Sequence, residues 1–412
     1  MTNLPQSWEV KTLSEISEIV TGSTPSKSNL DFYGKDYPFF KPSDFEQGYF
    51  LENAGDNLSK LGFDKARQLP PKTILVVCIG SLGKVALTRV IGSCNQQINA
   101  IIPHKNIISE YIYYYCISSK FQSILFSKAP QTTLAILNKT EFSKLKIIYP
   151  KDIKEQKRIV GILDESFAKI DESIKILEQD LLNLDELMQS ALQKAFNPLK
   201  DNAKENYKLP KGWEWKSLGE IANIKGGKRL PKGENLLDNS TKFAYIRVAD
   251  FQDNGTINLQ SVKFINENTY NILKNYKIYD DNLYISIAGT IGKSGIIPKE
   301  LNGAILTENA IKLEYIQNNI INKFMYFFTL SSSFKTQIQI STKIVAQPKL
   351  AITRLKQIQI PLPPLKEQEQ IASHLDELSS HVKNLKQNYQ AQIKDLQELK
   401  KSLLDKAFKG NL

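Results

Sequence analysis

The segment "KEQKRIVGILDES" at residues 154–166 returns as "KEQEQIASHLDEL" at residues 366–378. Each copy opens a long run in which apolar residues recur in alternating steps of four and three, which is the spacing of one helix face. The pattern predicts two helices that pack as a coiled coil, with one polar position at Gln392. The predicted seam residues are Leu163, Phe167, Ile170, Ile174, Leu177, Leu181 and Leu184 in the first run, and Ile371, Leu375, Leu378, Val382, Leu385, Leu396, Leu399 and Leu403 in the second.

A helix over residues 154–196 would be about 64 Å long at ~1.5 Å per residue, and a lone helix of that length would expose its apolar seam. The economical solution packs the two helices against each other, because each then covers the seam of the other. The alternative is two separate helices, each buried on its own domain.

The rest of the chain is also written twice. "LPQSWEVKTLSEISEIVTG" (4–22) returns at 209–227, and "FFKPSDF" (39–45) returns as "YIRVADF" (245–251). The offset between copies drifts within these parts and becomes constant in the helical runs. We therefore expect an internal two-fold repeat, in which each copy is a variable globular part followed by a helix of fixed length. Such symmetry would place Phe408 near Leu4.

The globular parts read as mixed α/β, so the predicted fold class is α+β. "TILVVCIG" and "NAIIP" are short β-branched runs typical of strands. "SEYIYYYCISSKFQSILF" (109–126) reads as helical, with its tyrosines in the core. The predicted organisation is a first globular domain at 1–150, a first long helix at 151–197, a linker at 198–208, a second globular domain at 209–360 and a second long helix at 361–412.

The composition is that of a globular protein of two ordinary domains. The chain has 412 residues, of which 41% are hydrophobic. It shows no basic start followed by an apolar run, and no stretch approaches the ~18 apolar residues of a membrane helix. Its cysteines have no C-x-x-C spacing, and its three histidines have no metal-ligand pattern. We expect a cytoplasmic protein with reduced cysteines and no metal site.

The positive charge is concentrated outside the helices. The chain has a net charge of +11. Residues 154–196 hold six basic and nine acidic residues, a net charge of −3, and residues 366–409 hold eight and seven, a net charge of +1. The remainder therefore carries +13. This distribution favours nucleic acid bound by the globular parts and protein partners bound along the helices.

The stretch "AGTIGKSG" (288–295) ends like a phosphate-binding loop, and "IGSLGKVA" (79–86) is its copy. The phosphate-binding pattern G-x-x-x-x-G-K-[ST] requires a glycine where Ile287 stands. The better interpretation is a tight hairpin between two strands, with glycine permitting a positive φ and with Lys84 and Lys293 exposed at its tip. Two such lysines, one per repeat, suit contacts to a phosphate backbone.

No motif for catalysis appears, since G-x-G-x-x-G, a serine elbow and a two-metal carboxylate cluster are all missing. We therefore expect a chain that binds and does not catalyse. The candidate DNA-binding residues are the cations that flank predicted turns, and phosphate contact is the expected role of most of them. They are Lys41, Lys84, Arg89, Lys225, Lys228, Arg229, Arg247 and Lys293.

Taken together, these motifs resemble the DNA specificity subunit of type I restriction–modification systems. Each repeat opens "LP-x-x-W-x-x-x-x-L", passes through "G-x-x-GK" and closes in "KEQ-x-x-I-x-x-x-LD". "IPLPPLKEQEQIASHLDE" (360–377) is the sharpest signature, and the first copy lacks two of its prolines. The resemblance implies two target-recognition domains, each reading one half of a bipartite site in double-stranded DNA, and a spacer of antiparallel helices.

The resemblance also implies partners. Two methyltransferase subunits would dock on the helices, and restriction subunits would join through them. The complex would have DNA adenine methyltransferase and ATP-dependent endonuclease activity, with S-adenosylmethionine, ATP and Mg bound by the partner subunits. The residues leave other readings open, namely a stand-alone two-headed DNA-binding regulator, a coiled-coil structural protein and an NTPase. The structural protein would leave the +13 of the globular parts unexplained.

Overall fold

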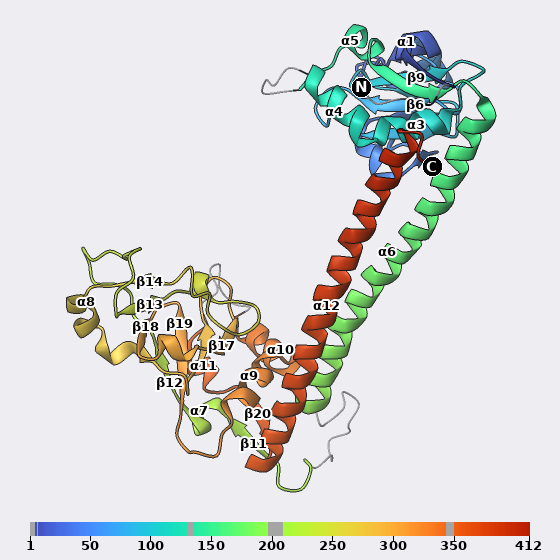
Figure 1. The fold of residues 1–412 in the computed structure, drawn as a ribbon. Coiled ribbons are helices and arrows are strands. Elements are labelled where there is room, and N and C mark those ends of the chain that lie inside the picture. Colours follow the sequence, from blue (N-terminus) through green and yellow to red (C-terminus); the bar gives the residue numbers. More distant parts are fainter. Residues whose placement is uncertain (1–4, 6, 130–134, 197–208, 343–349) are drawn as a thin grey trace. The chain divides into compact units, whose positions relative to one another are not determined.

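The computed structural model describes residues 5, 7–129, 135–196, 209–342 and 350–412. The chain forms two compact units. Unit 1 combines Met1–Glu178 with Gln390–Leu412, and unit 2 is Gln179–Tyr389. The chain passes between the units inside two long helices, α6 (Ile153–Phe196) and α12 (Leu365–Ala407) (Figure 1).

Unit 1 contains a five-stranded sheet of order β2-β9-β6-β7-β4, a three-stranded sheet of order β5-β3-β8 and the pair β1-β10. The strands are β1 (Trp8–Thr12), β2 (Ser17–Thr21), β3 (Tyr33–Phe40), β4 (Phe50–Leu51), β5 (Asp56–Leu58), β6 (Ile74–Val77), β7 (Val85–Thr88), β8 (Ser93–Cys94), β9 (Ile98–Pro103) and β10 (Lys146–Pro150). The shorter helices are α1 (Leu13–Ile16), α2 (Lys60–Lys65), α3 (Ser109–Ile117), α4 (Ser119–Lys128) and α5 (Lys139–Ser143).

Unit 2 repeats this plan with sheets of order β12-β19-β16-β17 and β14-β13-β18-β15 and the pair β11-β20. The strands are β11 (Glu214–Ser217), β12 (Ala222–Gly226), β13 (Ala244–Ile246), β14 (Lys263–Phe264), β15 (Lys277–Ile278), β16 (Leu283–Ser286), β17 (Ser294–Ile296), β18 (Ala304–Leu306), β19 (Ala310–Tyr315) and β20 (Gln359–Leu362). The shorter helices are α7 (Leu218–Ile221), α8 (Glu267–Ile272), α9 (Asn322–Leu330), α10 (Ser332–Thr342) and α11 (Ile352–Leu355).

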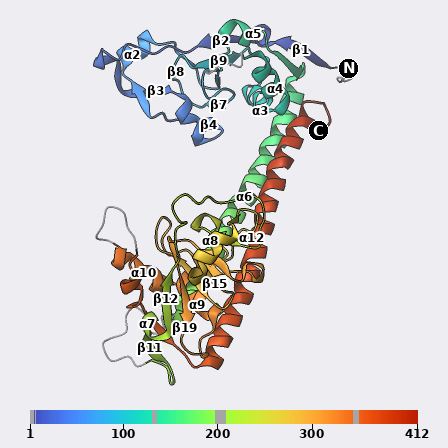
Figure 2. The same ribbon diagram turned by 90° about the vertical axis from the view of Figure 1, so that its left-hand side faces the viewer.

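The two units share their strand pairing as well as their motifs. In each, a parallel pair lies inside an otherwise antiparallel sheet, namely β3 with β8 and β13 with β18. Helix α3 packs against β6 and β7, and α9 packs against β16 and β17. The turned view in Figure 2 separates β3, β8 and α2 of unit 1 from α3 and α4, which lie beside the long helices. The predicted mixed α/β domains and internal repeat are confirmed.

The tyrosines of the run at 109–126 belong to the core, as predicted. Tyr111, Tyr114 and Tyr115 are at most 2% exposed. Tyr115 meets the ring of Phe408 edge-on, with 5.0 Å between ring centroids. Aromatic packing of this kind contributes beyond the area that it buries. The core of unit 1 therefore draws on α3 and on the end of α12.

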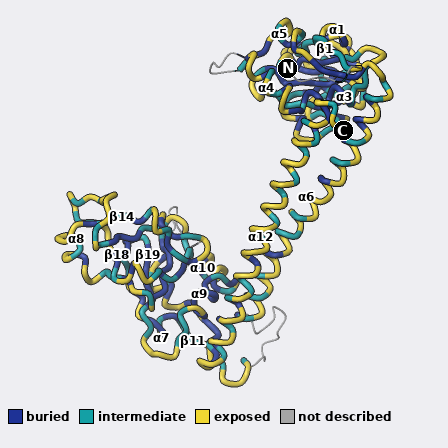
Figure 3. The backbone as a smooth tube through the Cα atoms, in the orientation of Figure 1, coloured by how far each residue is buried: buried dark blue, intermediate teal, exposed yellow. Residues whose placement is uncertain are grey.

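The long helices pack against each other within each unit, so the predicted antiparallel coiled coil is confirmed. Their outward faces are exposed (Figure 3). Leu163, Ile170 and Leu184 are buried, as residues of a seam should be. Leu385 and Leu399 differ from the predicted pattern, because they leave 40% and 46% of their surface exposed. Lys386 and Lys400, the residues that follow these two leucines, are half-buried. None of the described helices is long and apolar enough to cross a membrane.

The glutamine of the repeated KEQ motif ties each long helix to its own globular part. Gln156 is fully buried. Its Nε2 donates to the carbonyls of Asn106 and Pro150, at 3.2 and 3.0 Å, and its Oε1 accepts from the N–H of Ile108 at 2.9 Å. Gln368 makes the same three bonds, each at 3.0 Å, to Asn319, Pro363 and Ile321. We call each set of three bonds the glutamine clamp.

The two ends of the chain lie together in unit 1. A Cβ atom placed on Gly410 would stand 2.4 Å from Cγ of Pro5 and 3.8 Å from the ring of Trp8. Arg158 also donates to the carbonyl of Leu412 at 2.8 Å. The sequence predicted that Phe408 approaches Leu4, which lies outside the described residues, and the neighbouring Pro5 shows the expected proximity.

Candidate DNA-binding surface

The repeated glycine-lysine stretch forms a hairpin turn in both units, as predicted. It joins the antiparallel strands β6 and β7 in unit 1, and β16 and β17 in unit 2. Gly83 and Gly292 have φ values of 90° and 88°, which L-residues rarely adopt. A phosphate-binding loop connects a strand to a helix. The stretch that ends in "GKSG" is therefore not a nucleotide-binding loop.

Lys84 and Lys293 make equivalent ion pairs beside these hairpins. Lys84 Nζ lies 3.2 Å from the carboxylate of Glu46, and Lys293 Nζ lies 2.8 Å from that of Asp253. The lysines are partly covered, whereas the acidic side chains are 79% and 99% exposed. Such exposed pairs contribute little to stability, so a phosphate group can compete for the same ammonium.

Arg247 and Lys41 begin equivalent 3₁₀ turns, but their side chains have different partners. In both units the N–H of the cation's residue donates to a buried aspartate three positions later, at 2.7 Å to Asp44 and 2.8 Å to Asp250. The Arg247 guanidinium also grips Asp250 with two bonds, at 3.1 and 2.7 Å, and donates to the carbonyl of Ser261. The hydrogen bonds to Asp250 raise the pKa of Arg247. Lys41 instead pairs with Asp56.

Arg89 follows β7 and has its guanidinium over an aromatic ring. Its guanidinium carbon is 3.7 Å from the ring centroid of Phe50, and its Nη1 is 3.0 Å from a carboxylate oxygen of Glu52. Half of its side chain remains exposed. The stack orients the guanidinium while leaving donors for an incoming acceptor.

The predicted basic cluster of unit 2 begins at Lys225 within β12 and continues with Lys228 and Arg229 beyond its end, and its charge is neutralised in part. Lys225 pairs with Glu314 at 2.5 Å, and Arg229 pairs with Glu308 at 2.7 Å. Burial acts to raise the pKa of Glu308, but the hydrogen bond from Arg229 and others outweigh it and lower that pKa. Lys228 has its ammonium 5.9 Å from the ring centroid of Tyr276. The Arg229 side chain is 80% exposed, which makes it the most open of the candidates that pair with a carboxylate.

The structure therefore places seven of the eight candidates against a carboxylate and Lys228 against a ring. Their assignment to DNA stays a prediction. Sequence reasoning missed the acidic partners, because Glu46 and Glu308 are far from their cations along the chain. The repeated Asp-Phe that follows Lys41 and Arg247 by three residues was visible in the sequence, but the bonds that Asp44 and Asp250 make were not. No role was predicted for the two clamp glutamines, although their repetition in both copies is a signal that could have found them.

The Lys84→Ala, Lys293→Ala double variant is expected to weaken binding to all DNA sequences alike and to reduce the salt slope of log K by up to about two. A salt titration of affinity for duplex DNA measures both effects. Glu46→Gln with Asp253→Asn is the matched variant, because it frees the same lysines and should strengthen binding. Unchanged affinity and slope in both variants would make these lysines hairpin supports.

The described residues were also compared with the patterns of metal sites and reactive cysteines. No group of three His, Cys, Asp or Glu side chains among them could hold a metal ion. The three cysteines are buried and unpaired. Burial raises the pKa of the Cys78 and Cys94 thiols to about 12, which keeps them protonated and unreactive at neutral pH.

The helix pair carries a repeated apolar feature on its outer side. Leu187 of α6 and Leu399 of α12 occupy equivalent positions in the repeat and are 48% and 46% exposed. Leu187 lines a groove of about 590 Å³ in unit 2, beside Trp213, Ile371 and Leu378. Exposed leucines at related positions on both helices are suited to two copies of one protein partner.

Each unit also has a cleft between its globular part and the helix pair. The cleft of unit 1, of about 980 Å³, is bordered by Tyr49, Tyr113, Asp164 and Phe167. The hydroxyl of Tyr114 donates to Asp164 at 2.5 Å across its floor. The cleft of unit 2, of about 420 Å³, is formed by equivalent elements and is bordered by Tyr326, Lys323 and Asp376, the last two forming an ion pair at 2.5 Å.

Comparisons with known proteins agree with this plan. A family model described as "Type I restriction modification DNA specificity domain" matches residues 5–181 and again residues 210–395. The specificity subunit of the type I restriction enzyme MjaIX from Methanocaldococcus jannaschii is 27% identical over 99% of this chain and 94% of its own. That of HindI from Haemophilus influenzae is 37% identical over 43% of this chain and 40% of its own.

A chain from a structural study of complex assembly and conformational transition of the type I R-M system shares the fold. It superposes with a TM-score of 0.81 at 18% sequence identity, and the match covers 100% of both chains. The two family matches fall on the two structural repeats and together span most of the sequence. This chain therefore belongs to the family of type I restriction modification DNA specificity domains, and it carries that domain twice.

Proposed function

We propose that this chain is the specificity subunit of a type I restriction–modification complex and that each unit reads one half of a bipartite site in double-stranded DNA. The observation that carries the proposal is the duplication itself. The two domains are built on related but not identical sheets and share the same hairpin, and they have different loops and different exposed side chains. Different surfaces on one scaffold read different base sequences.

In this proposal the chain supplies recognition and its partners supply chemistry. Methyltransferase subunits would bind S-adenosylmethionine and methylate adenine, and restriction subunits would use ATP and Mg to cleave DNA. Supporting the recognition role, the residues outside the two helical runs carry a net charge of +13, which favours binding to a polyanion. The stand-alone regulator remains the second candidate, because the same scaffold could bind DNA without partners.

Mapping of methylated sites in DNA exposed to the chain with its methyltransferase tests the proposal. The expected result is a motif of two different short half-sequences separated by positions with no base preference. A control binding assay uses the chain without the methyltransferase. One contiguous motif would refute bipartite reading, and site-specific binding at full strength by the chain alone would favour the regulator.

We also propose that the methyltransferase subunits dock on the helix pair near Leu187 and Leu399. A Leu187→Asp, Leu399→Asp variant is expected to lose most methyltransferase binding, since each aspartate would be desolvated at an apolar contact. Co-purification with the methyltransferase measures this effect. Glu172→Asp with Glu186→Asp, at exposed positions of α6, is the control. Undiminished co-purification of the leucine variant with the methyltransferase would place the docking surface elsewhere.

A further inference from the structure

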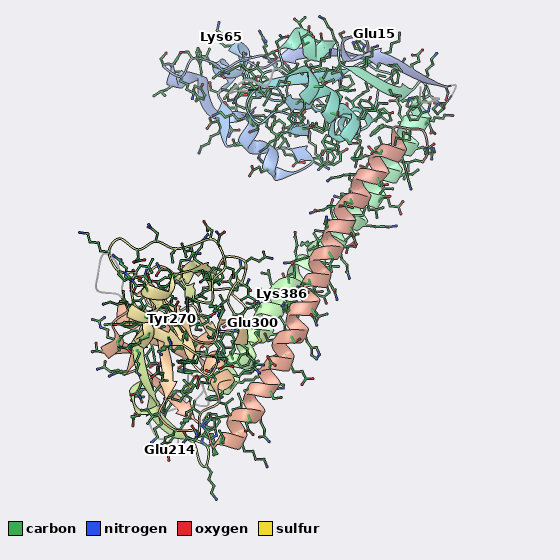
Figure 4. The ribbon with its side chains drawn as sticks, turned by 60° about the vertical axis from the view of Figure 1, so that its left-hand side comes forward. Glu15, Lys65, Glu214, Tyr270, Glu300 and Lys386 are labelled. Atoms are coloured by element: carbon green, nitrogen blue, oxygen red, sulfur yellow. The ribbon has the colours of Figure 1, made fainter. Side chains whose placement is uncertain are left out.

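Two ion pairs join α6 to α12, one in each unit. Asp171 pairs with Lys400 in unit 1, and Asp185 pairs with Lys386 at 2.5 Å in unit 2. The partners lie two heptads apart on both helices, so one antiparallel register accounts for both pairs. The two lysine side chains are only 22% and 28% exposed, and Lys400 also lies 4.8 Å from the ring centroid of Phe167. Figure 4 labels Lys386 on α12.

The internal repeat shows that these positions differ between the helices. It equates Asp171 and Asp185 of α6 with Lys383 and Gln397 of α12. It also equates Lys386 and Lys400 of α12 with two apolar residues of α6, Ile174 and Met188. At these equivalent positions α6 is acidic or apolar, whereas α12 is basic or neutral polar.

If two copies of α6, or two copies of α12, paired in the register of the α6–α12 pair, their charged side chains would not be complementary. Two α12 helices would bring Lys383 of each against Lys400 of the other. Two α6 helices would set Asp171 against Met188 and Asp185 against Ile174, which leaves both carboxylates without a cation. Like charges at such positions cost about as much as opposite charges gain, and partial burial strengthens both effects. The net charges of −3 and +1 on the two helical runs act in the same direction.

We propose that Asp171, Asp185, Lys386 and Lys400 make α6 select α12 and reject a second α6, so that homotypic pairing of α6 with α6 or of α12 with α12 between copies of this chain is disfavoured. Helix pairing then always combines one unit 1 globular part with one unit 2 globular part. The consequence for DNA rests on the proposed function: because unlike helices pair, the complex reads two different half-sequences. A homotypic pair would present the same recognition domain twice and would read a symmetric site.

Charge reversal in the full chain tests the selection. Asp171→Lys with Asp185→Lys, and separately Lys386→Asp with Lys400→Asp, should each lower the Tm by about 5–10 °C. The fourfold reversal should restore most of the loss, since it rebuilds both pairs. Glu172→Lys with Glu186→Lys is the control, because it changes the charge of α6 equally on exposed positions. Asp171→Asn with Asp185→Asn serves if the reversed chains fail to fold.

Co-expression of differently tagged copies tests partner choice. The Asp171→Lys, Asp185→Lys chain should co-purify with the Lys386→Asp, Lys400→Asp chain, because α6 of each then complements α12 of the other. Neither variant should co-purify with its own tagged copy to the same extent. Equal co-purification in all combinations, or no recovery of Tm in the fourfold variant, would overturn the inference. Neither readout involves DNA or methyltransferase, so failure of the bipartite reading would appear separately, in methylation mapping.

Discussion

Replacing Gln156 or Gln368 with leucine is expected to lower the free energy of unfolding of the altered unit by about 2–5 kcal/mol. Each glutamine is at most 1% exposed and satisfies two backbone carbonyls and one backbone N–H. Leucine fills a similar volume but leaves one buried carbonyl, that of Pro150 or Pro363, and two partly buried groups without their partner. A buried unpaired group costs about 1–3 kcal/mol, and a lost hydrogen bond at a partly buried group about 0.5–1.5 kcal/mol. Domain stability is only about 5–15 kcal/mol, so the loss is a large share.

Urea denaturation followed by circular dichroism measures this loss. Gln387→Ala is the control, because Gln387 is an exposed glutamine of α12 and should change stability little. A Gln156→Leu chain that is as stable as the control would show that the clamp does not hold the helix to its globular part.

Gln156→Glu gives the clamp prediction a pH signature. A carboxylate can accept from the Ile108 N–H, but it cannot donate to the carbonyls of Asn106 and Pro150. Burial and these carbonyls favour the protonated form, so the introduced carboxyl group should have a folded-state pKa above its unfolded value. The folded state then binds more protons, and stability relative to the natural chain should rise as pH falls through the folded pKa. Urea denaturation of this variant at a series of pH values measures the effect, and a pH-independent difference from the natural chain would contradict it.

Inserting one heptad into both α6 and α12 is expected to lengthen the unread spacer of the DNA site by about three base pairs. Seven residues add about 10.5 Å to a helix, and a base pair occupies about 3.4 Å. The insertion points are Glu178/Gln179 and Tyr389/Gln390, where the chain passes between the units. Insertion there keeps the heptad phase and leaves the pairs Asp171–Lys400 and Asp185–Lys386 intact.

Methylation-site mapping of the lengthened chain with its methyltransferase measures the spacer. The half-sequences themselves should not change, because the insertion touches neither globular part. Three base pairs also turn the second half-site by about a third of a DNA turn, so weaker binding is expected. Insertion into α6 alone is the control and should abolish assembly, since one helix register must break. A lengthened chain that keeps the original spacer would show that the helices do not set the spacing.

Much of the architecture could be predicted from local sequence patterns. The seam spacing, the internal repeat and the β-branched runs predicted the long helices, the duplicated α/β parts and strands such as β6 and β9, because each depends on the order of neighbouring residues. The hairpin could be told from a phosphate-binding loop by one position, Ile287. Burial of Tyr111 and Tyr115 followed from the apolar character of their helix.

The sequence by itself determined the repeat, the helices and the family resemblance, whereas the tertiary structure decided which acidic side chain pairs with each candidate cation. Lys84 meets Glu46 and Arg229 meets Glu308 only because strands and loops that are remote in the chain lie together. The same holds for the glutamine clamp, whose partners Asn106 and Asn319 are some fifty residues away. Periodicity describes one element at a time, but an ion pair or a buried hydrogen bond depends on the distance between two elements, which is set when the whole core packs.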